Sequence, residues 1–247
     1  MEQLRNATPA EFVMFPQEPV KRMHAALAGS TGADYMHGRG FDDKTLNHFE
    51  IGYSDKKNMV VVPMHDPTGM LIGFVGRSIE GKRFQNSDGL PKAKTAWNFH
   101  RARRYGDTVI IVESSFDAMR IHQAGYPNVI ALLGGSLSRW HIEQLNKTFT
   151  TIIIMTDFDL HFEKGRCRKC NGDCRGHRPG RDLGWQIAEA LPFKKIRWAI
   201  YDDFHVFPFE KKDATDCTDA EIAQMLQDPV TSLEYRTLDL DAIVMVD

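Results

Sequence analysis

Three acidic residues stand at the ends of apolar runs that predict buried strands. Glu113 follows the run at residues 108–112, and Asp157 and Asp159 come after the run at 151–155 with one residue between them. Alternate residues of an extended segment point the same way, so Asp157 and Asp159 can project together; Glu113 joins them if the two strands are neighbours. Clustered carboxylates repel one another, and a divalent cation removes that penalty. Oxygen ligands suit Mg²⁺ or Mn²⁺, so the pattern predicts such a site, with strand-end or helix-capping acids as the alternative.

A second cluster of candidate ligands occupies residues 167–177. Cys167, Cys170, Cys174 and His177 are separated by two, three and two residues, whereas Cys217 stands alone. Sulfur and imidazole ligands at such spacing suit a tetrahedral zinc site. Clustered cysteines in a cytosolic protein indicate metal binding more than disulfides. We expect zinc here, with reduced surface thiols or another metal as the alternatives.

Short runs rich in β-branched residues alternate with helical patterns and would position the acids. The runs lie at residues 108–112, 129–133, 151–155 and 196–200, and the helical patterns at 115–124, 138–147 and 183–191. Buried runs that alternate with helices predict an α/β fold with a parallel sheet flanked by helices. Open sheets of this kind bind ligands at the carboxyl ends of their strands, where the acidic residues stand.

The chain before residue 107 has a different pattern. Strands at residues 60–63 and 70–74 flank a turn at 66–69, where Pro67 and Gly69 favour a hairpin. A helical pattern covers residues 33–49 with a break at 38–40, residues 1–30 show little organisation, and residues 80–105 predict loops with short strands. We expect a smaller, basic α+β subdomain ahead of the parallel sheet, and one further helix at 218–226.

The bulk composition is that of an ordinary folded protein. The chain has 247 residues, of which 42% are hydrophobic and 26% charged, and its formal net charge is −2. No apolar run is long enough to predict a membrane span, and the acidic N-terminus is unlike a signal peptide. We therefore expect a cytoplasmic protein without membrane contact, in the host cytoplasm if the gene is viral.

Basic and acidic residues are unevenly distributed along the chain. Residues 82–104 carry seven Lys or Arg and one acid, residues 161–182 carry seven and three, and residues 202–247 carry three and twelve. This segregation favours a protein that holds a polyanion in one place and cations in another, although solvated surface charge gives the same pattern.

Two segments resemble motifs of Toprim domains, and two more resemble motifs of DnaG-type primases, which contain such a domain. Residues 112–118, V-E-S-S-F-D-A, look like the V-E-G-x-x-D of that domain, and residues 157–159, D-F-D, look like its D-x-D. Residues 131–138, A-L-L-G-G-S-L-S, are similar to the A-x-L-G-T-x-L-T of DnaG-type primases, and residues 212–216, K-D-A-T-D, to their K-D-P-x-D. The resemblance implies a Toprim-type parallel sheet around a divalent metal site.

The N-terminal half narrows the resemblance to the catalytic core of DnaG-type primases. Residues 35–41 and 49–53, Y-M-H-G-R-G-F and F-E-I-G-Y, resemble its Y-L-x-x-R-G-I and F-x-I-G-Y. Residues 62–77 carry V-P-M-H-D and then I-G-F-V-G-R, similar to F-P-I-x-D and G-x-I-x-G-F-x-G-R. Residues 83–87, R-F-Q-N-S, resemble K-Y-x-N-S. These motifs follow the order of that family from about residue 33 to residue 227.

The resemblance implies roles for individual residues. The principal ligands of Mg²⁺ or Mn²⁺ would be Glu113, Asp157 and Asp159, supported by Asp117, Asp213 and Asp216. The groove for template and nucleotide would be lined by Arg39, Arg77, Arg83, Asn86 and Lys92. Arg and Lys suit phosphate, although for each basic residue taken alone a solvated surface position is the alternative.

The sequence departs from the family pattern at three places. Ser114 stands where the family has Gly, so we expect a different backbone there, and Gly135 stands where Thr is usual. The A-G that follows the D-x-D is delayed by an insertion, and we place its equivalent at Leu183-Gly184. The insertion holds the Cys/His cluster and is basic, so we expect it to touch template or primer in place of the separate zinc-binding domain of DnaG-type primases.

These features together predict a DNA primase, which joins ribonucleotides into short RNA primers on single-stranded DNA by metal-dependent nucleotidyl transfer. The expected domains are an extension at 1–30, an α+β subdomain at 31–106, a Toprim domain at 107–216 with the Cys/His loop at 160–181, and an acidic helical tail at 217–247. A Toprim nuclease and a non-catalytic, nucleic-acid-binding replication accessory protein are the alternatives.

The expected partners are single-stranded DNA template and ribonucleoside triphosphates. The chain contains no Walker motif, so a replicative helicase on another chain is a further candidate partner. The small size favours a phage or plasmid origin.

Overall fold

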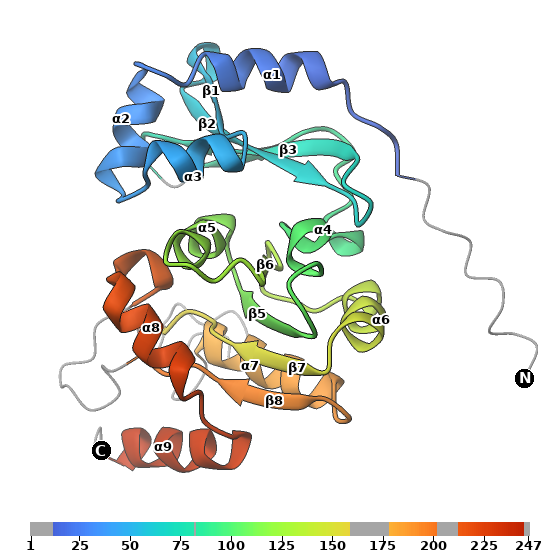
Figure 1. Cartoon of the computed structure of the whole chain (residues 1–247), viewed down its shortest axis with the longest axis vertical. Coiled ribbons are helices and arrows are strands. Elements are labelled where there is room, and N and C mark those ends of the chain that lie inside the picture. Colours follow the sequence, from blue (N-terminus) through green and yellow to red (C-terminus); the bar gives the residue numbers. More distant parts are fainter. Residues whose placement is uncertain (1–11, 82, 159–177, 202–211, 245–247) are drawn as a thin grey trace, which may run out of the picture.

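Two four-stranded sheets form the framework of the protein (Figure 1). The computed structural model describes residues 12–81, 83–158, 178–201 and 212–244. The first sheet is antiparallel, and the second is parallel with helices around it. The predicted α/β class with a preceding α+β portion is therefore confirmed. No helix among these residues has the length and apolar character needed to cross a bilayer.

The antiparallel sheet has the strand order β1-β2-β3-β4. Its strands are β1 (Gly52–Ser54), β2 (Met59–His65), β3 (Leu71–Ser78) and β4 (Phe84–Asn86). The predicted hairpin is β2–β3, and its turn is closed by the Asp66 carboxylate, which accepts from the backbone N–H groups of Thr68 and Met70 at 2.8 and 2.9 Å. Gly69 has φ +95°, a conformation that other residues adopt only with strain.

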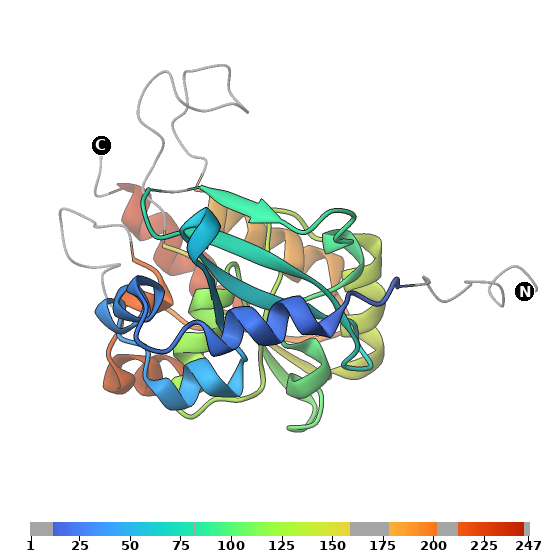
Figure 2. The same cartoon turned by 90° about the horizontal axis from the view of Figure 1, so that it is seen from above.

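Helices cover this sheet, so its central strand is apolar on both faces. They are α1 (Gln17–Ala25), α2 (Thr31–Gly38) and α3 (Asp43–His48), and α1 crosses the sheet when the molecule is seen from above (Figure 2). Every residue of β2 from Met59 to Met64 is buried. Helix α1 lies in a stretch that we expected to be weakly organised. Its Val20 is buried, and Pro19 is tolerated because it stands in the first turn.

The parallel sheet has the order β6-β5-β7-β8. Its strands are β5 (Thr108–Val112), β6 (Val129–Ala131), β7 (Thr151–Ile154) and β8 (Lys195–Trp198), close to the predicted runs. Residues Val109 to Val112 are at most 1% exposed, which explains the continuous β-branched run. Strand β5 pairs with β7, so the two strands that precede the predicted metal ligands are neighbours.

The helices around this sheet begin at recognisable capping residues. They are α4 (Phe99–Ala102), α5 (Ser115–Gln123), α6 (Arg139–Thr148), α7 (Pro179–Ala190), α8 (Asp219–Gln227) and α9 (Ser232–Val244). Ser114, Ser138 and Thr218 cap α5, α6 and α8 with reciprocal side-chain and backbone hydrogen bonds. Helix α7 begins at Pro179 rather than at residue 183, because Pro is favoured at the first helical position. Helix α4 was not predicted, whereas α9 lies within the helical tail predicted at residues 217–247.

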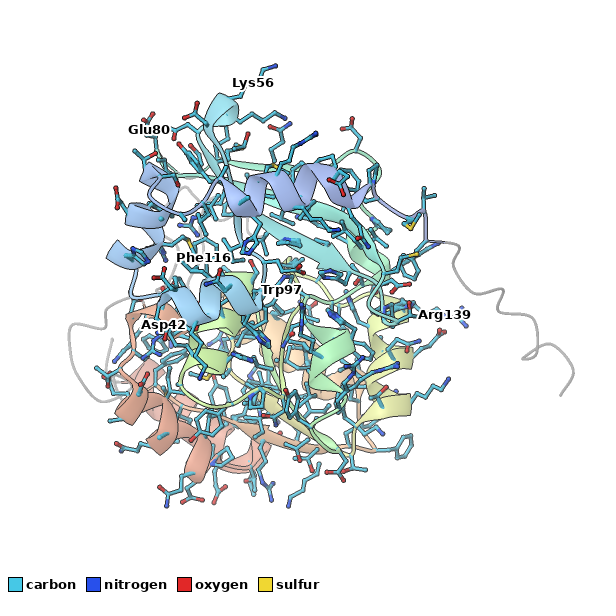
Figure 3. All side chains as sticks on the ribbon, turned by 45° about the horizontal axis from the view of Figure 1, so that its top comes forward. Asp42, Lys56, Glu80, Trp97, Phe116 and Arg139 are labelled. Carbon is cyan, nitrogen blue, oxygen red and sulfur yellow. The ribbon has the colours of Figure 1, made fainter. Side chains whose placement is uncertain are left out.

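The two sheets are joined through Trp97 and the start of α5. The backbone of Trp97 exchanges hydrogen bonds of 2.8 and 3.2 Å with Ala131 of β6, and its indole N–H donates to the Pro63 carbonyl of β2 at 3.1 Å. The rings of Phe41 and Phe116 meet edge to face with centroids 5.7 Å apart. Figure 3 shows Trp97 and Phe116 in the interior between the two parts. These contacts hold the antiparallel sheet over the carboxyl ends of β5 and β6.

Candidate metal and nucleic-acid site

The register of the parallel sheet brings Glu113 and Asp157 together. Ile111 of β5 lies opposite Ile154 of β7, so the residues that leave the two strands continue side by side. The backbone N–H of Asp157 donates to Glu113 Oε1 at 3.1 Å. Asp159, the third principal ligand that we expected, lies outside the described residues. The described part of the predicted triad therefore meets at one end of the sheet.

A glycine at the start of α7 allows these acids to approach the helix. A Cβ atom on Gly180 would lie 2.1 Å from the Asp157 carbonyl oxygen and 2.9 Å from Glu113 Oε1. Gly184, in the segment that we compared with the A-G position, faces the ring of Trp198. A Cβ atom on Gly184 would lie 2.5 Å from the nearest ring carbon. Of the two glycines, Gly180 is the one beside the acids, and Gly184 serves the packing of α7 on β8.

Asp117 is a buried carboxylate in the first turn of α5. Its Oδ2 accepts from the backbone N–H and the hydroxyl of Ser114, while its Oδ1 is buried without a hydrogen-bond partner. Burial, and then the negative charge of Asp213, raise the pKa of Asp117 to about 7. Ser114 has the extended backbone of an ordinary N-cap residue, φ −111° and ψ 156°, so no glycine conformation is needed at this position.

Asp213 caps the start of the 3₁₀ helix η4 (Ala214–Asp216) and Asp216 is its last residue; the helix packs against α5. The Asp213 carboxylate accepts from the backbone N–H and the hydroxyl of Thr215 at 2.9 and 2.6 Å, and Asp216 accepts from the backbone N–H of Asp213 at 3.0 Å. These bonds give both acids a capping role in addition to the ligand role implied by the resemblance.

A cavity of about 420 Å³ joins the acids to two arginines. Asp117, Asp157, Asp213 and Asp216 line it from the parallel-sheet side. Arg39, Arg77 and Phe84 line it from the antiparallel-sheet side, and Ser114, Phe116 and Thr215 complete its wall. The cavity therefore has an acidic side and a basic side, and its two arginines lie outside the basic segments at residues 82–104 and 161–182.

Aromatic rings hold the two arginines in place. The guanidinium carbons of Arg39 and Arg77 lie 5.4 and 4.8 Å from the ring centroid of Phe116. Arg77 Nε donates to the Tyr35 hydroxyl at 3.0 Å, and Arg39 donates to the Thr215 hydroxyl at 3.2 Å. Such stacking and hydrogen bonding fix an arginine better than they would a lysine. Sequence reasoning assigned no role to Phe116 or Tyr35, although both fall within the quoted motifs.

The other expected groove residues stand apart from the cavity lining. Arg83 and Asn86 are both exposed: Arg83 directly precedes β4, and Asn86 is its last residue. Lys92 is partly buried in the 3₁₀ helix η2 (Lys92–Lys94). Burial lowers the pKa of Lys92. Phe84, which we had not singled out, does line the cavity: it is 57% exposed, with the Arg77 guanidinium 5.5 Å from its ring centroid. Cys167, Cys170, Cys174 and His177 lie outside the described residues.

The donors around this cavity suit a hard divalent cation. The orphaned Oδ1 of Asp117 is a buried acceptor, and burial together with the negative charge of Asp213 raises the pKa of that carboxyl. A bound cation would favour its ionised form. Within the described ranges, no three His, Cys, Asp or Glu side chains already stand close enough together to hold an ion. Asp159, water and substrate phosphate would complete the ligand shell, as is common for Mg²⁺.

The family and sequence comparisons agree with the motifs quoted above. Residues 107–166 match the model of the Toprim domain. The DNA primase of Staphylococcus aureus strain MSSA476 is 29% identical over 144 residues, which cover 51% of this chain and 24% of that protein. The chain thus spans about a quarter of the length of the curated relatives it matches.

Solved structures share the fold over most of the chain. The zinc-binding and RNA polymerase domains of the Aquifex aeolicus primase superpose with a TM-score of 0.66 and 20% identity, covering 88% of this chain and 61% of that one. A DnaG primase catalytic domain bound to single-stranded DNA gives a TM-score of 0.65 and 18% identity, with 87% and 80% covered.

Proposed function

We propose that this chain, which has the fold of the DnaG primase catalytic core and a Toprim domain at residues 107–166, synthesises short RNA primers on a single-stranded DNA template. The observation that carries the proposal is the single cavity with carboxylates on one side and two ring-supported arginines on the other. The substrates are ribonucleoside triphosphates, joined by nucleotidyl transfer. The curated relatives that match this chain are DNA primases, which supports the same reaction.

The acidic side of the cavity is the part that handles the metal. Asp157 and Asp117, with Glu113, Asp159, Asp213 and Asp216, would hold Mg²⁺ or Mn²⁺. When bound, such a cation supplies a Lewis acid that favours ionisation of the attacking 3′-hydroxyl and offsets charge on the departing pyrophosphate. The Asp157 backbone and the Glu113 carboxylate hold each other by a 3.1 Å hydrogen bond, which keeps the two donors in register before substrate arrives.

The basic side of the cavity binds the polyanions. Arg39 and Arg77 bind phosphate oxygens, and their contacts to Phe116 and Tyr35 reduce the side-chain freedom lost on binding. The exposed ring of Phe84 offers a face on which a base stacks. Arg83, Asn86 and Lys92 extend the basic surface away from the cavity, toward the path of the template strand.

The proposal is tested by incubating the protein with single-stranded DNA, labelled ribonucleotides and Mg²⁺ or Mn²⁺. We expect new RNA, whereas cleavage of the template would favour a Toprim nuclease and binding alone an accessory protein. In the double variant Asp157→Asn, Asp159→Asn, RNA synthesis should fall by more than about 100-fold, because replacing even outer-shell partners of a metal site costs up to that much. The fold should remain intact.

A matched control replaces two acids that are exposed and outside the cavity. The double variant Asp55→Asn, Asp88→Asn removes the same charge and should keep wild-type synthesis. Full activity in the Asp157/Asp159 variant would refute the site, and absence of RNA from the wild-type protein with template, nucleotides and either metal would refute the proposed function.

A further inference from the structure

Tyr201 stands at the same level of the parallel sheet as Asp157. Trp198 of β8 lies opposite Ile154 of β7, and the Ala199 N–H donates to the Ile154 carbonyl at 2.9 Å. Asp157 lies three residues after Ile154, and Tyr201 lies three residues after Trp198. Both residues line one small cavity of about 20 Å³, together with Arg178 and Arg181. That volume is what a single water molecule requires.

The Tyr201 hydroxyl is buried and makes no hydrogen bond with any residue that the structure describes. The residue is 3% exposed, and its oxygen has no partner among those residues. A buried hydroxyl without a partner is less stable than a satisfied one. Burial, and then the carboxylates of Asp117 and Asp157, raise the pKa of this phenol well above its usual value. Tyr201 thus supplies an O–H donor close to the acids of the site.

A phenylalanine would fill the same interior space without the unsatisfied hydroxyl. Tyr201 packs in the core, and the ring alone accounts for that packing. Nothing in the stability of the described protein requires the oxygen atom. Its position on the acidic side of the site suggests a different use for it, since outer-shell donors orient the carboxylates that ligate metals.

We propose that Tyr201 is a positioning residue of the metal site: when the cation is bound, its hydroxyl donates through one water in the shared cavity to the Asp157 carboxylate and aims that carboxylate at the ion. The inference rests on the proposed metal site and deepens it by one residue. It predicts that removing the hydroxyl has opposite effects on two properties. The metal-free protein should be at least as stable without the hydroxyl, whereas its affinity for the cation should fall.

The test is Tyr201→Phe, with Mn²⁺ affinity measured by electron paramagnetic resonance on the full chain and thermal stability measured without metal. We expect Mn²⁺ binding to weaken roughly 10- to 100-fold, the range found for outer-shell partners. The metal-free melting temperature should be unchanged or higher. The control Tyr105→Phe removes a hydroxyl from a side chain that is 53% exposed and should change neither property.

Two results would overturn the inference. Unchanged Mn²⁺ affinity in Tyr201→Phe would mean that the hydroxyl does not serve the site, and a lower metal-free melting temperature would assign it a structural role instead. Primer synthesis by the wild-type protein is measured separately. If it is present while Mn²⁺ affinity is unaffected, only the role of Tyr201 fails; if it is absent while affinity drops, only the proposed function fails.

Discussion

Single residues at the starts of two helices decide how closely the acidic groups gather. Ser114 caps α5 and holds one oxygen of Asp117, which leaves the other oxygen turned away from the cap. Gly180 at the start of α7 lets the helix backbone touch the Asp157 carbonyl and the Glu113 carboxylate. The geometry of the acidic side thus depends on a hydroxyl and on a missing side chain as well as on the acids themselves.

Replacing Gly180 should damage the site through backbone displacement. In Gly180→Ala the new methyl group would lie 2.1 Å from the Asp157 carbonyl oxygen, so α7 or the Asp157 backbone must move. Overpacking of this kind typically costs about 1–3 kcal/mol, which urea denaturation would detect. Gly38→Ala, at a helical glycine with no atom within 4 Å of the added methyl, is the control and should not destabilise the protein. Equal stability of the two variants would contradict this account.

At the scale of elements, the segment inserted between β7 and α7 is the feature that departs most from the DnaG pattern. It carries the Cys/His cluster, seven basic residues fall within residues 161–182, and α7 resumes the sheet-covering pattern at Pro179. The insertion leaves the strand register intact, since β7 still pairs with both β5 and β8. The described residues on either side of it, Phe158 and Arg178, line one cavity together with Asp157.

We predict that this segment binds zinc and contributes to template binding. In Cys167→Ser, Cys170→Ser the zinc content measured by mass spectrometry should fall by about one ion per chain, because two of four thiolate or imidazole ligands are lost. Affinity for single-stranded DNA, measured by fluorescence anisotropy at fixed salt, should fall as well. Cys217→Ala, which alters a buried cysteine, is the control for zinc content. Wild-type zinc content and affinity in the double variant would disprove the prediction.

At the scale of the whole molecule, histidine pairs bridge the two sheets. The rings of His48 and His122 stack between α3 and α5 with centroids 4.5 Å apart, and those of His65 and His100 pack between β2 and α4 at 4.8 Å. The positive charge of Arg101 acts on both pairs. The arrangement holds together best when the rings are neutral.

Stability should therefore fall in mild acid. Burial is the main reason that the pKa values of His65 and His122 are lowered to about 4, and that of His100 to about 3, from 6.5. At a pH between about 4 and 6.5, these histidines bind protons in the unfolded chain but remain neutral in the folded protein. The stabilisation is thus fully present above pH 6.5 and is lost as pH falls toward 4. Melting temperatures across this range should show the decline.

The histidine origin of that decline can be separated from other titrations. His122→Asn removes one ring from the buried set and should make the fall in melting temperature shallower. An identical slope in wild-type protein and His122→Asn would show that this ring does not contribute.

Local sequence patterns were enough to predict the strands of the parallel sheet, the hairpin and the types of residue at the site. Runs such as residues 108–112 are apolar on both faces because both faces are covered, and this leaves a local signature. Caps such as Ser114 and turns such as that at Asp66 likewise act on near neighbours in the chain. Local chemistry of this kind is readable without a structure, and so was the order of the quoted motifs.

The side chains that support the site are set by contacts between distant segments of the chain. Phe116 lies under both arginines, Gly180 approaches Asp157, and Tyr201 shares a cavity with Asp157, yet no local pattern distinguishes these residues from ordinary core or helix positions. Helix α1 likewise forms where the sequence shows weak organisation, because it packs on β1 and β2. Each of these features depends on contacts between segments distant in the chain, and it is tertiary packing rather than local propensity that supplies their free energy.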